Sequence, residues 1–392
     1  MFAAMDTPPF PSGFAMDAAG HRLTLYPRGP ERMAALLALI AGARTTLSLF
    51  FYMFDPDDAG QRVQAALAAA AARGVTVTLI IDAFGSSNTS DGFFAPLRAA
   101  GGAVHYFSRR WRTSYLIRNH QKMAIADGAR MLGGGFNIAD DYFAAPGDGD
   151  GWHDVGLLID GPGVARMADW FAQLHDFVVH HDGNWFRLRR LLIAWRAGDG
   201  DLQWMIGGPT QRLSPWARAM KRDLLAARQI DMVMAYFSPG QGMLRRIAQV
   251  AGRGRARLIL PAKSDNGATI GAARLLYGFL LKRGVAIAEY QPSKLHMKLI
   301  VIDDAVYIGS ANFDMRSLYL NLELMVRVRD AAFAERMRSF VADHAPLCED
   351  ITPALHRARA GWLTRLRWML SWFVVGAVDY TVARRLNFGL KG

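Results

Sequence analysis

The sequence predicts an α/β protein built from two tandem copies of one unit, with mixed sheets flanked by helices and an active site between the two halves. Two observations favour this fold class. Each half of the 392-residue chain has the same order of apolar, β-rich segments and helical segments. Each half also contains one His-x-Lys-x4-Asp pattern, followed by a glycine-rich turn that ends in Asn. Strands that alternate with helices indicate sheets that are largely buried.

The expected elements follow one another in matching order. The first half has a strand at 46–54, a helix at 61–73 and a strand at 75–81; the second has a strand at 230–237, a helix at 243–253 and a strand at 257–260. In each half a helix and a strand beginning near Gly102 or Gly284 then precede the strand with the His-x-Lys pattern. Such internal repetition predicts a duplicated fold.

Five regions are expected along the chain. They are an N-terminal extension (1–22), a first half (23–180), a linker or insert (181–208), a second half (209–347) and a C-terminal tail (348–392). The linker contains an Arg-rich segment with aromatic and Leu neighbours, 185–195. This segment is consistent with an amphipathic surface helix or strand, or with an insert that contacts a membrane.

Composition allows a large core and favours a polyanionic partner. Hydrophobic residues make up 52% of the chain, and the single cysteine, Cys348, excludes an intrachain disulfide. The net charge of +12 favours nucleic acid or an anionic lipid surface as partner but does not distinguish them.

No segment is expected to cross a membrane. The nearest candidate, 368–378, would cover only about 16 Å as a helix, against a hydrocarbon core of about 30 Å. Residues 1–17 have no basic patch before an apolar run and do not resemble a signal peptide. We therefore expect the cytoplasmic side of the membrane for any attachment.

The repeated pattern supplies the candidate catalytic residues. Side chains two positions apart on a strand share a face, so His120 projects with Lys122, and His296 with Lys298. Asp127 and Asp303 lie at an odd offset, on the other face or past the strand end, and we expect a structural role for them.

The turns after these strands add phosphate-binding candidates, Asn137 in the first half and Ser310 and Asn312 in the second. One His as nucleophile, a second as proton donor and acceptor, and two Lys with two Asn around an oxyanion would form a phosphoryl-transfer site. Such a site needs no metal or cofactor, and no ligand cluster of the usual zinc kind is visible in the sequence.

A catalytic imidazole also needs its far nitrogen held, usually by a carboxylate. Asp154 and Glu323 are candidates, because each opens an apolar strand where a core residue is expected. Alternatively, either could pair with a neighbouring Lys or Arg. A lone histidine is more often structural, and we assign that role to His105, His153, His180, His181 and His344.

These residues resemble the phospholipase D superfamily, whose defining feature is the paired His-x-Lys-x4-Asp pattern, and most of all bacterial cardiolipin synthases. The similarity extends from about Leu23 to Arg329. The segments that carry it are Arg118-Asn-His-Gln-Lys-Met, Gly134-Gly-Phe-Asn-Ile-Ala-Asp, His296-Met-Lys-Leu, Gly309-Ser-Ala-Asn-Phe-Asp-Met-Arg-Ser and Asn321-Leu-Glu.

The resemblance implies a phosphatidyltransferase that joins two phosphatidylglycerol molecules, or uses phosphatidylethanolamine, through a phosphohistidine intermediate. It implies one His as nucleophile and the other as general acid and then base. We assign these roles to His120 and His296 in that order, and the near-symmetry of the two halves leaves the reverse order open. The chain is similar to the short type without a pair of N-terminal membrane spans. Two departures make the half-sites unequal: Trp152 stands where the second half has Asn321, and Gly134 or Gly135 where it has Ser310.

Two segments have the composition of a membrane interface. The tail from 361 to 385 combines Trp and Phe with flanking Arg, and a packed core helix is the alternative reading. The loop 108–118 precedes His120 and could dock at headgroups or simply be solvated. The residues concerned are Trp362, Trp368, Trp372, Phe373, Arg365, Arg367, Arg384 and Arg385 in the tail, and Arg109, Arg110, Trp111, Arg112 and Tyr115 in the loop.

Three alternative functions remain open from the sequence. A nuclease of the same superfamily would use the same site and a basic surface, although it would gain nothing from a Trp-rich tail. A phospholipid hydrolase or headgroup-exchange enzyme would differ only in its acceptor, which depends on pocket shape and water exclusion. A non-catalytic lipid-binding protein is the third, and two intact motifs argue against it.

Overall fold

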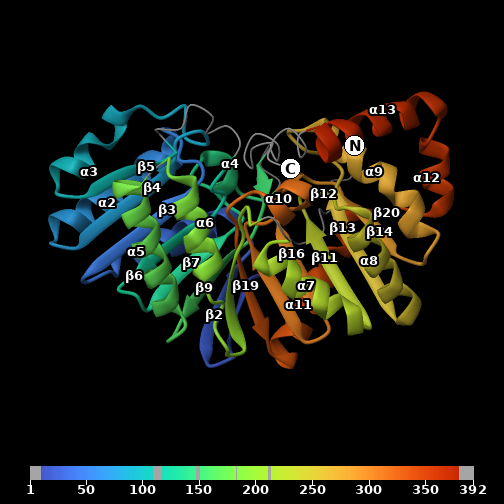
Figure 1. The fold of residues 1–392 in the computed structure, drawn as a ribbon, viewed down its shortest axis with the longest axis horizontal. Helices are drawn as coiled ribbons and strands as arrows, with labels where there is room; N and C mark the ends of the chain where they lie inside the picture. Colours follow the sequence, from blue (N-terminus) through green and yellow to red (C-terminus); the bar gives the residue numbers. More distant parts are fainter. Residues whose placement is uncertain (1–9, 109–116, 147–150, 182, 211–212, 379–392) are drawn as a thin grey trace, which may run out of the picture.

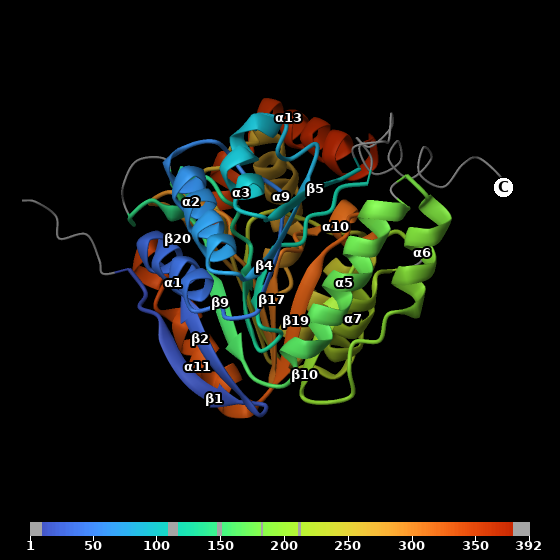
Figure 2. The same ribbon diagram turned by 90° about the vertical axis from the view of Figure 1, so that its left-hand side faces the viewer.

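The protein folds into two α/β halves that lie side by side (Figures 1 and 2). The computed structural model describes residues 10–108, 117–146, 151–181, 183–210 and 213–378. Each half contains one mixed eight-stranded sheet with helices against it. The predicted fold class, a tandem duplication of one α/β unit, is confirmed.

The sheet of the first half has its parallel strands at one end and its antiparallel strands at the other. In spatial order its strands are β1 (Phe14–Ala18), β2 (His21–Tyr26), β9 (Gly156–Asp160), β7 (Arg130–Gly134), β6 (Met123–Ala126), β3 (Thr46–Phe51), β4 (Thr76–Asp82) and β5 (Ala103–Phe107).

The sheet of the second half repeats this order. Its strands are β10 (Leu202–Ile206), β19 (Leu324–Arg329), β17 (Ala305–Gly309), β16 (Lys298–Ile302), β11 (Gln229–Met234), β13 (Arg255–Pro261), β14 (Ala286–Tyr290) and β20 (Cys348–Asp350). The run β9-β7-β6-β3-β4-β5 therefore corresponds to β19-β17-β16-β11-β13-β14. In both runs the pairing is antiparallel up to the fourth strand, β3 or β11, and parallel from that strand onward.

Helices complete the layers. They are α1 (Gly29–Ala41), α2 (Asp58–Ala72), α3 (Ala95–Ala99), α4 (Asp140–Phe143), α5 (Val164–His180) and α6 (Trp185–Ala194) before β10, and α7 (Pro215–Ala226), α8 (Gln241–Arg253), α9 (Gly267–Leu281), α10 (Met315–Tyr319), α11 (Ala331–Ala342), α12 (Pro353–Arg359) and α13 (Trp362–Trp372) after it. Within the described residues no helix is both long enough and apolar enough to span a bilayer.

The predicted strands and helices agree with the structure to within a few residues. The expected strand 46–54 is β3, the helix 61–73 is α2, and the helix 243–253 is α8. One detail differs: β6 and β16 begin after the histidines, so His120 and His296 precede the strands that were expected to carry them. At these positions the chain pairs with the opposite half instead.

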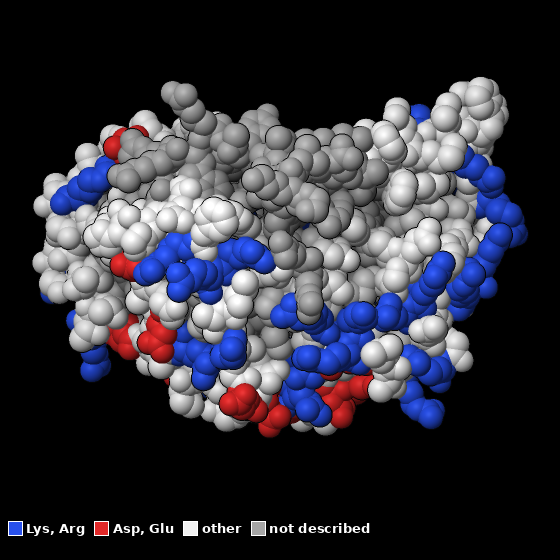
Figure 3. Space-filling view, in the orientation of Figure 1, with Lys and Arg blue, Asp and Glu red and all other residues white. Residues whose placement is uncertain are grey.

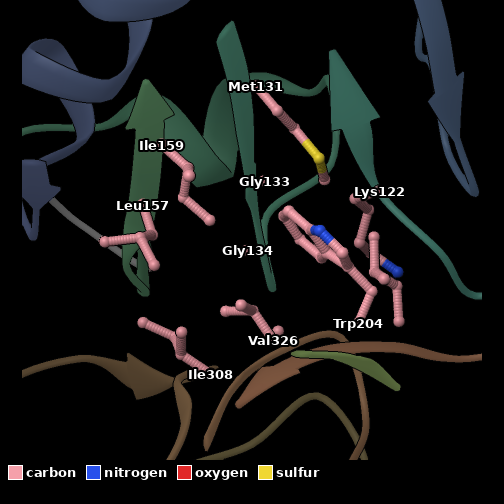
Figure 4. Close-up of a pocket in the computed structure, with 11 residues that line it drawn as sticks. Lys122, Met131, Gly133, Gly134, Leu157, Ile159, Trp204, Ile308 and Val326 are labelled. Carbon is pink, nitrogen blue, oxygen red and sulfur yellow. The ribbon is translucent and has the colours of Figure 1, made fainter. Parts of the chain in front are cut away.

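The two sheets share one apolar core where they face each other. Met131, Leu157 and Ile159 from β7 and β9 point toward Ile308 and Val326 from β17 and β19 (Figure 4). The cavity left between them is about 20 Å³, which is close to the space of a single water molecule. The two sheets therefore pack closely against each other at this place.

Candidate active site

Each catalytic-candidate histidine is held by the half of the molecule that does not contain it. The backbone N–H of His120 donates to the carbonyl of Leu322, at 2.8 Å. The N–H of His296 donates to the carbonyl of His153, also at 2.8 Å, beside a short parallel pair of β15 (Lys294–Leu295) and β8 (Trp152–His153). These exchanges place both histidines at the junction between the halves.

The two carboxylates predicted to orient the histidines are exchanged between the halves as well. His120 Nδ1 lies 3.2 Å from Glu323 Oε2, and His296 Nδ1 lies 2.7 Å from Asp154 Oδ2. Both carboxylates are fully buried. The alternative, in which each simply pairs with a neighbouring Lys or Arg, does not describe these contacts.

The surroundings of the two Nδ1 atoms differ. His120 Nδ1 also lies 3.1 Å from the carbonyl oxygen of Ser310, so both of its partners are acceptors. That nitrogen must therefore carry the proton, which leaves Nε2 with a free lone pair. His296 Nδ1 has Asp154 on one side and Lys298 Nζ, a donor, at 2.8 Å on the other. Either tautomer of His296 therefore has a partner.

Both imidazoles have a pKa below the usual value of histidine, which favours their neutral forms. Burial, assisted by the charge of Lys122, lowers the pKa of His120 to about 4. Burial and the charge of Lys298 lower the pKa of His296 to about 3. A neutral imidazole can act as a nucleophile or accept a proton, so the free enzyme is poised for attack on an electrophile.

The side chains of Lys122 and Lys298 contact the backbone of the two histidines and do not line the cavity that holds both histidines. Lys122 Nζ donates to the carbonyl of His120 at 2.7 Å, and Lys298 Nζ donates to the carbonyl of His296. Burial lowers the pKa of Lys122 well below its usual value, and lowers that of Lys298 to about 8. Both lysines are almost completely buried.

The aspartates of the two motifs stand away from the histidines and bind backbone. Asp127, directly after β6, accepts from the N–H groups of Arg44, Thr45 and Thr46. Asp303, directly after β16, accepts from those of Arg228 and Gln229. These contacts tie each motif strand to the start of the antiparallel strand beside it, β3 or β11, and neither aspartate lines the cavity.

The glycine-rich turns differ at one matched position. Gly134 and Gly309 are alike, because a Cβ on either would lie within 2.3 Å of a carbonyl of the adjacent strand. At the next position, a Cβ on Gly135 would lie 2.7 Å from both carboxylate oxygens of Asp154. Ser310 occupies that place in the second half, and its hydroxyl donates to Glu323 Oε2 at 2.5 Å.

The candidates for phosphate binding are placed unequally. Asn137 lines the cavity that holds both histidines, where its amide donates to the hydroxyl of Tyr142 at 3.0 Å. Asn312 is 6% exposed, and its side-chain oxygen has no hydrogen-bond partner among the described residues. Ser310 is fully buried, and besides Glu323 it contacts the N–H of Leu324. Ser310 thus holds the carboxylate and does not face the cavity.

The shared cavity has a volume of about 530 Å³, large enough for a phospholipid headgroup region. Its wall is formed by residues of both halves that follow strand ends. They include the two histidines and Asn137, the aromatic residues Tyr52, Tyr142, Trp152 and Tyr236, the acidic residues Asp55, Asp57, Asp141 and Asp265, and Arg118. Among the described residues, no group of His, Cys, Asp and Glu is arranged to hold a metal ion.

Sequence reasoning missed the acidic and aromatic wall and two supporting side chains. Arg32 is buried behind Asp154 and donates to its backbone carbonyl and to that of Tyr142. Asp82, fully buried at the end of β4, accepts from the N–H of Asn119 beside His120. Asp82 could have been predicted as a site residue, because it is a polar residue directly after an apolar strand. No feature of the sequence singles out Arg32.

Four of the other histidines form two pairs away from the cavity. His153 Nε2 lies 2.9 Å from His344 Nε2, and His105 lies 3.2 Å from His175. His180 and His181 lie at the end of α5. The loop residues Arg109, Arg110, Trp111, Arg112 and Tyr115, and the tail residues Arg384 and Arg385, lie outside the described part of the chain.

Comparison with known proteins agrees with this architecture. Residues 36–175 and 223–344 match the family described as "Cardiolipin synthase, PLD-like domain". The chain is 30% identical to cardiolipin synthase A of Pseudomonas fluorescens, over 83% of this chain and 69% of that protein. It is 28% identical to cardiolipin synthase B of Escherichia coli, over 88% of this chain and 85% of that protein.

A solved structure shares the fold at low sequence identity. The phosphatidylserine synthase of Haemophilus influenzae superimposes with a TM-score of 0.71 at 13% identity, covering 96% of this chain and 98% of that one. The fold and the crossed histidine site thus define an enzyme of the phospholipase D class. Within that class, the chain belongs to the cardiolipin synthase, PLD-like family, a family of phosphatidyltransferases.

Proposed function

We propose that this protein is a cardiolipin synthase that transfers a phosphatidyl group between two phosphatidylglycerol molecules, through a phosphohistidine on His120. The observation that carries the proposal is the pair of histidines in one cavity, each oriented by a carboxylate of the opposite half. A double displacement at a phosphodiester needs a nucleophile and a proton shuttle, and this arrangement supplies both without a metal.

In the first step, Nε2 of His120 attacks the phosphorus of one phosphatidylglycerol. Binding of the anionic phosphodiester favours the protonated form of His296. The bond from phosphorus to the glycerol headgroup breaks, His296 gives that proton to the leaving oxygen, and glycerol departs. Glu323 stabilises the positive charge that the phosphorylated imidazole gains. Asn137, Asn312 and the charges of Lys122 and Lys298 stabilise the phosphoryl oxygens.

In the second step, a free hydroxyl of another phosphatidylglycerol loses its proton to His296 and attacks the phosphorus. The bond to His120 breaks, and cardiolipin is released. His296 suits this role because its Nδ1 has both an acceptor, Asp154, and a donor, Lys298, within 2.8 Å. Asp154 stabilises the ring when it is protonated, and the charge of Lys298 favours its return to the neutral form.

The exposed apolar side chains of the tail support attachment to an anionic membrane surface. α13 turns Trp362, Leu363, Leu366, Met369 and Leu370 outward, with exposed fractions from 49% to 76%. Trp368 packs inward, 8% exposed and stacked on His356, so α13 is docked on one side only. Figure 1 places it beside the end of the molecule that carries α4 and α10, where the cavity residues lie. We propose that this face meets the membrane from the cytoplasmic side.

A separate basic surface lies below α13 in the view of Figure 3 and could also attract anionic lipid. Figure 3 shows Lys and Arg gathered over the face that carries α7 and α8. Arg218 and Arg222 of α7 and Arg245 of α8 are exposed there. Each basic residue near an anionic surface contributes about 1 kcal/mol.

Lipid product analysis tests the proposal. Purified protein is incubated with phosphatidylglycerol vesicles, alone or with phosphatidylethanolamine, beside a His120→Ala control. Cardiolipin from the wild type and none from the control is the expected result. Phosphatidic acid as the only product would indicate a hydrolase instead, and cleavage of single-stranded DNA without any lipid turnover would indicate a nuclease.

A further inference from the structure

A second cavity, of about 390 Å³, lies between α8, α9 and α13, away from the histidines. Its walls are mainly apolar and are formed by Leu244 of α8, by Leu275, Leu276 and Phe279 of α9, and by Trp372 of α13. Its polar lining comes from Gln241 and Arg245, whose side chains are hydrogen-bonded to each other at 3.3 Å. We call this cavity the α9 groove.

The α9 groove leaves apolar side chains incompletely covered. α9 is apolar on nearly all sides, which is typical of a helix that is buried all round. Leu275, Leu276 and Phe279 are nevertheless only partly buried, and they are the α9 residues that face the groove. An apolar ligand in the groove would remove their surface from water.

The same two chain segments line the α9 groove and the catalytic cavity. Tyr236 and Asp265 line the cavity and are hydrogen-bonded to each other at 2.7 Å. Pro239, three residues after Tyr236, lines the groove, and α9 begins two residues after Asp265. Leu275 lies ten residues beyond Asp265, or about 15 Å along a helix. One acyl chain spans about half of a 30 Å hydrocarbon core, which is the same distance.

The outer wall of the α9 groove is also continuous with the proposed membrane face. Trp372 is the last residue of α13, the helix that exposes Leu366, Met369 and Leu370. Figures 1 and 2 both show α13 lying along α9 at the same end of the molecule. A lipid that leaves the bilayer beside α13 would meet the groove before the cavity.

We propose that the α9 groove binds one acyl chain of the phospholipid whose phosphodiester occupies the catalytic cavity. The inference rests on the proposed function and adds to it a subsite for the lipid tail. The groove selects long-chain donors and helps to draw the lipid from the membrane surface toward His120. Binding there depends on the length of the chain and is independent of the headgroup chemistry.

The test measures kcat/KM for dihexanoyl and dioleoyl phosphatidylglycerol, both in the same excess of neutral detergent micelles. Leu276→Trp fills the α9 groove, and Leu225→Trp, at an exposed leucine of α7, is the matched control. For the wild type we expect the long-chain lipid to be preferred by about tenfold or more, because each buried methylene adds to binding. Leu276→Trp should lower this ratio at least fivefold, and Leu225→Trp should leave it unchanged.

The ratio does not depend on how much of a variant is folded, because both substrates use the same enzyme. Trp372→Ala, which removes the outer wall, should lower it as well. An unchanged ratio in both Leu276→Trp and Trp372→Ala would overturn the inference. So would stimulation of the short-chain reaction by an uncleavable long-chain phosphonate lipid, since the occupant would then be a separate lipid. Failure of the wild type to form cardiolipin from either substrate would overturn the proposed function itself.

Discussion

The two half-sites share one plan but surround their histidines differently. In both, a carboxylate from the opposite half contacts Nδ1. At His120 the second contact is a carbonyl, so the proton stays on Nδ1 and Nε2 keeps its lone pair. At His296 the second contact is the ammonium of Lys298, and the ring can change its protonation. In the mechanism that we propose, the duplication supplies a nucleophile on one side and a proton shuttle on the other.

The carboxylates are supported by different means. Glu323 accepts from the hydroxyls of Ser310 and Ser317 and from the amide of Asn321. Asp154 is shorter; it contacts His296 and the N–H of Val155, and it needs the space that Gly135 leaves open. The sequence departures between the halves are therefore adaptations to a longer and a shorter carboxylate.

The largest effect should separate the two histidines. We expect His120→Ala to lose about 10⁴-fold or more in kcat with any donor, because no covalent intermediate forms. His296→Ala should lose a similar factor with phosphatidylglycerol, yet retain most of the first step with phosphatidyl-p-nitrophenol, whose leaving group departs as an anion. The release of p-nitrophenol measures this. Equal loss in both variants with the activated donor would contradict the assignment.

The carboxylates should show the same division at a smaller scale. Glu323→Gln removes the charge that balances the phosphorylated imidazole, and we expect a loss of about 10²-fold or more with both donors. Asp154→Asn should lose a comparable factor with phosphatidylglycerol and far less with phosphatidyl-p-nitrophenol. Steady-state rates with the two lipid donors measure these losses. If both variants lost the same factor with each donor, the proposed difference between the half-sites would be contradicted.

The pH dependence of kcat/KM should reveal the ionisation of Lys298. In the proposed mechanism its protonated form stabilises the phosphoryl oxygens, and burial lowers its pKa to about 8. The positive charge is therefore present below pH 8 and lost above it, so kcat/KM should fall above about pH 8, by about tenfold per pH unit. Lys298→Arg should move this limb upward. A profile that stays flat to pH 10 in the wild type would contradict this role.

The smallest effects should come from the matched positions 135 and 310. Ser310→Ala removes the hydroxyl that holds Glu323 and should cost about 1–2 kcal/mol in the free energy of unfolding. Gly135→Ala places a Cβ against the Asp154 carboxylate and should lower kcat about tenfold through a displaced His296. Denaturant unfolding and steady-state rates measure the two changes. If Gly135→Ala is fully active, the asymmetry of the turns has no catalytic consequence.

The sequence predicts the duplicated fold and the candidate catalytic residues because the same pattern occurs in both halves of the chain. His120 and His296 stand out only because their surroundings recur, and Asp127 and Asp303 follow from the odd offset. The crossing of the carboxylates could not be predicted, since no local pattern tells which strand of one half lies beside a loop of the other. Asp265 and Tyr236 were missed for the same reason, because they meet only after folding.

Covalent trapping tests the central claim most directly. Protein mixed with labelled phosphatidylglycerol is quenched within milliseconds under alkaline conditions, digested, and mapped by mass spectrometry. A phosphatidyl adduct on His120 is the expected result, and it should accumulate in His296→Ala supplied with phosphatidyl-p-nitrophenol, because the acceptor is no longer deprotonated. An adduct on His296, or turnover without any adduct, would contradict the division of roles between the half-sites.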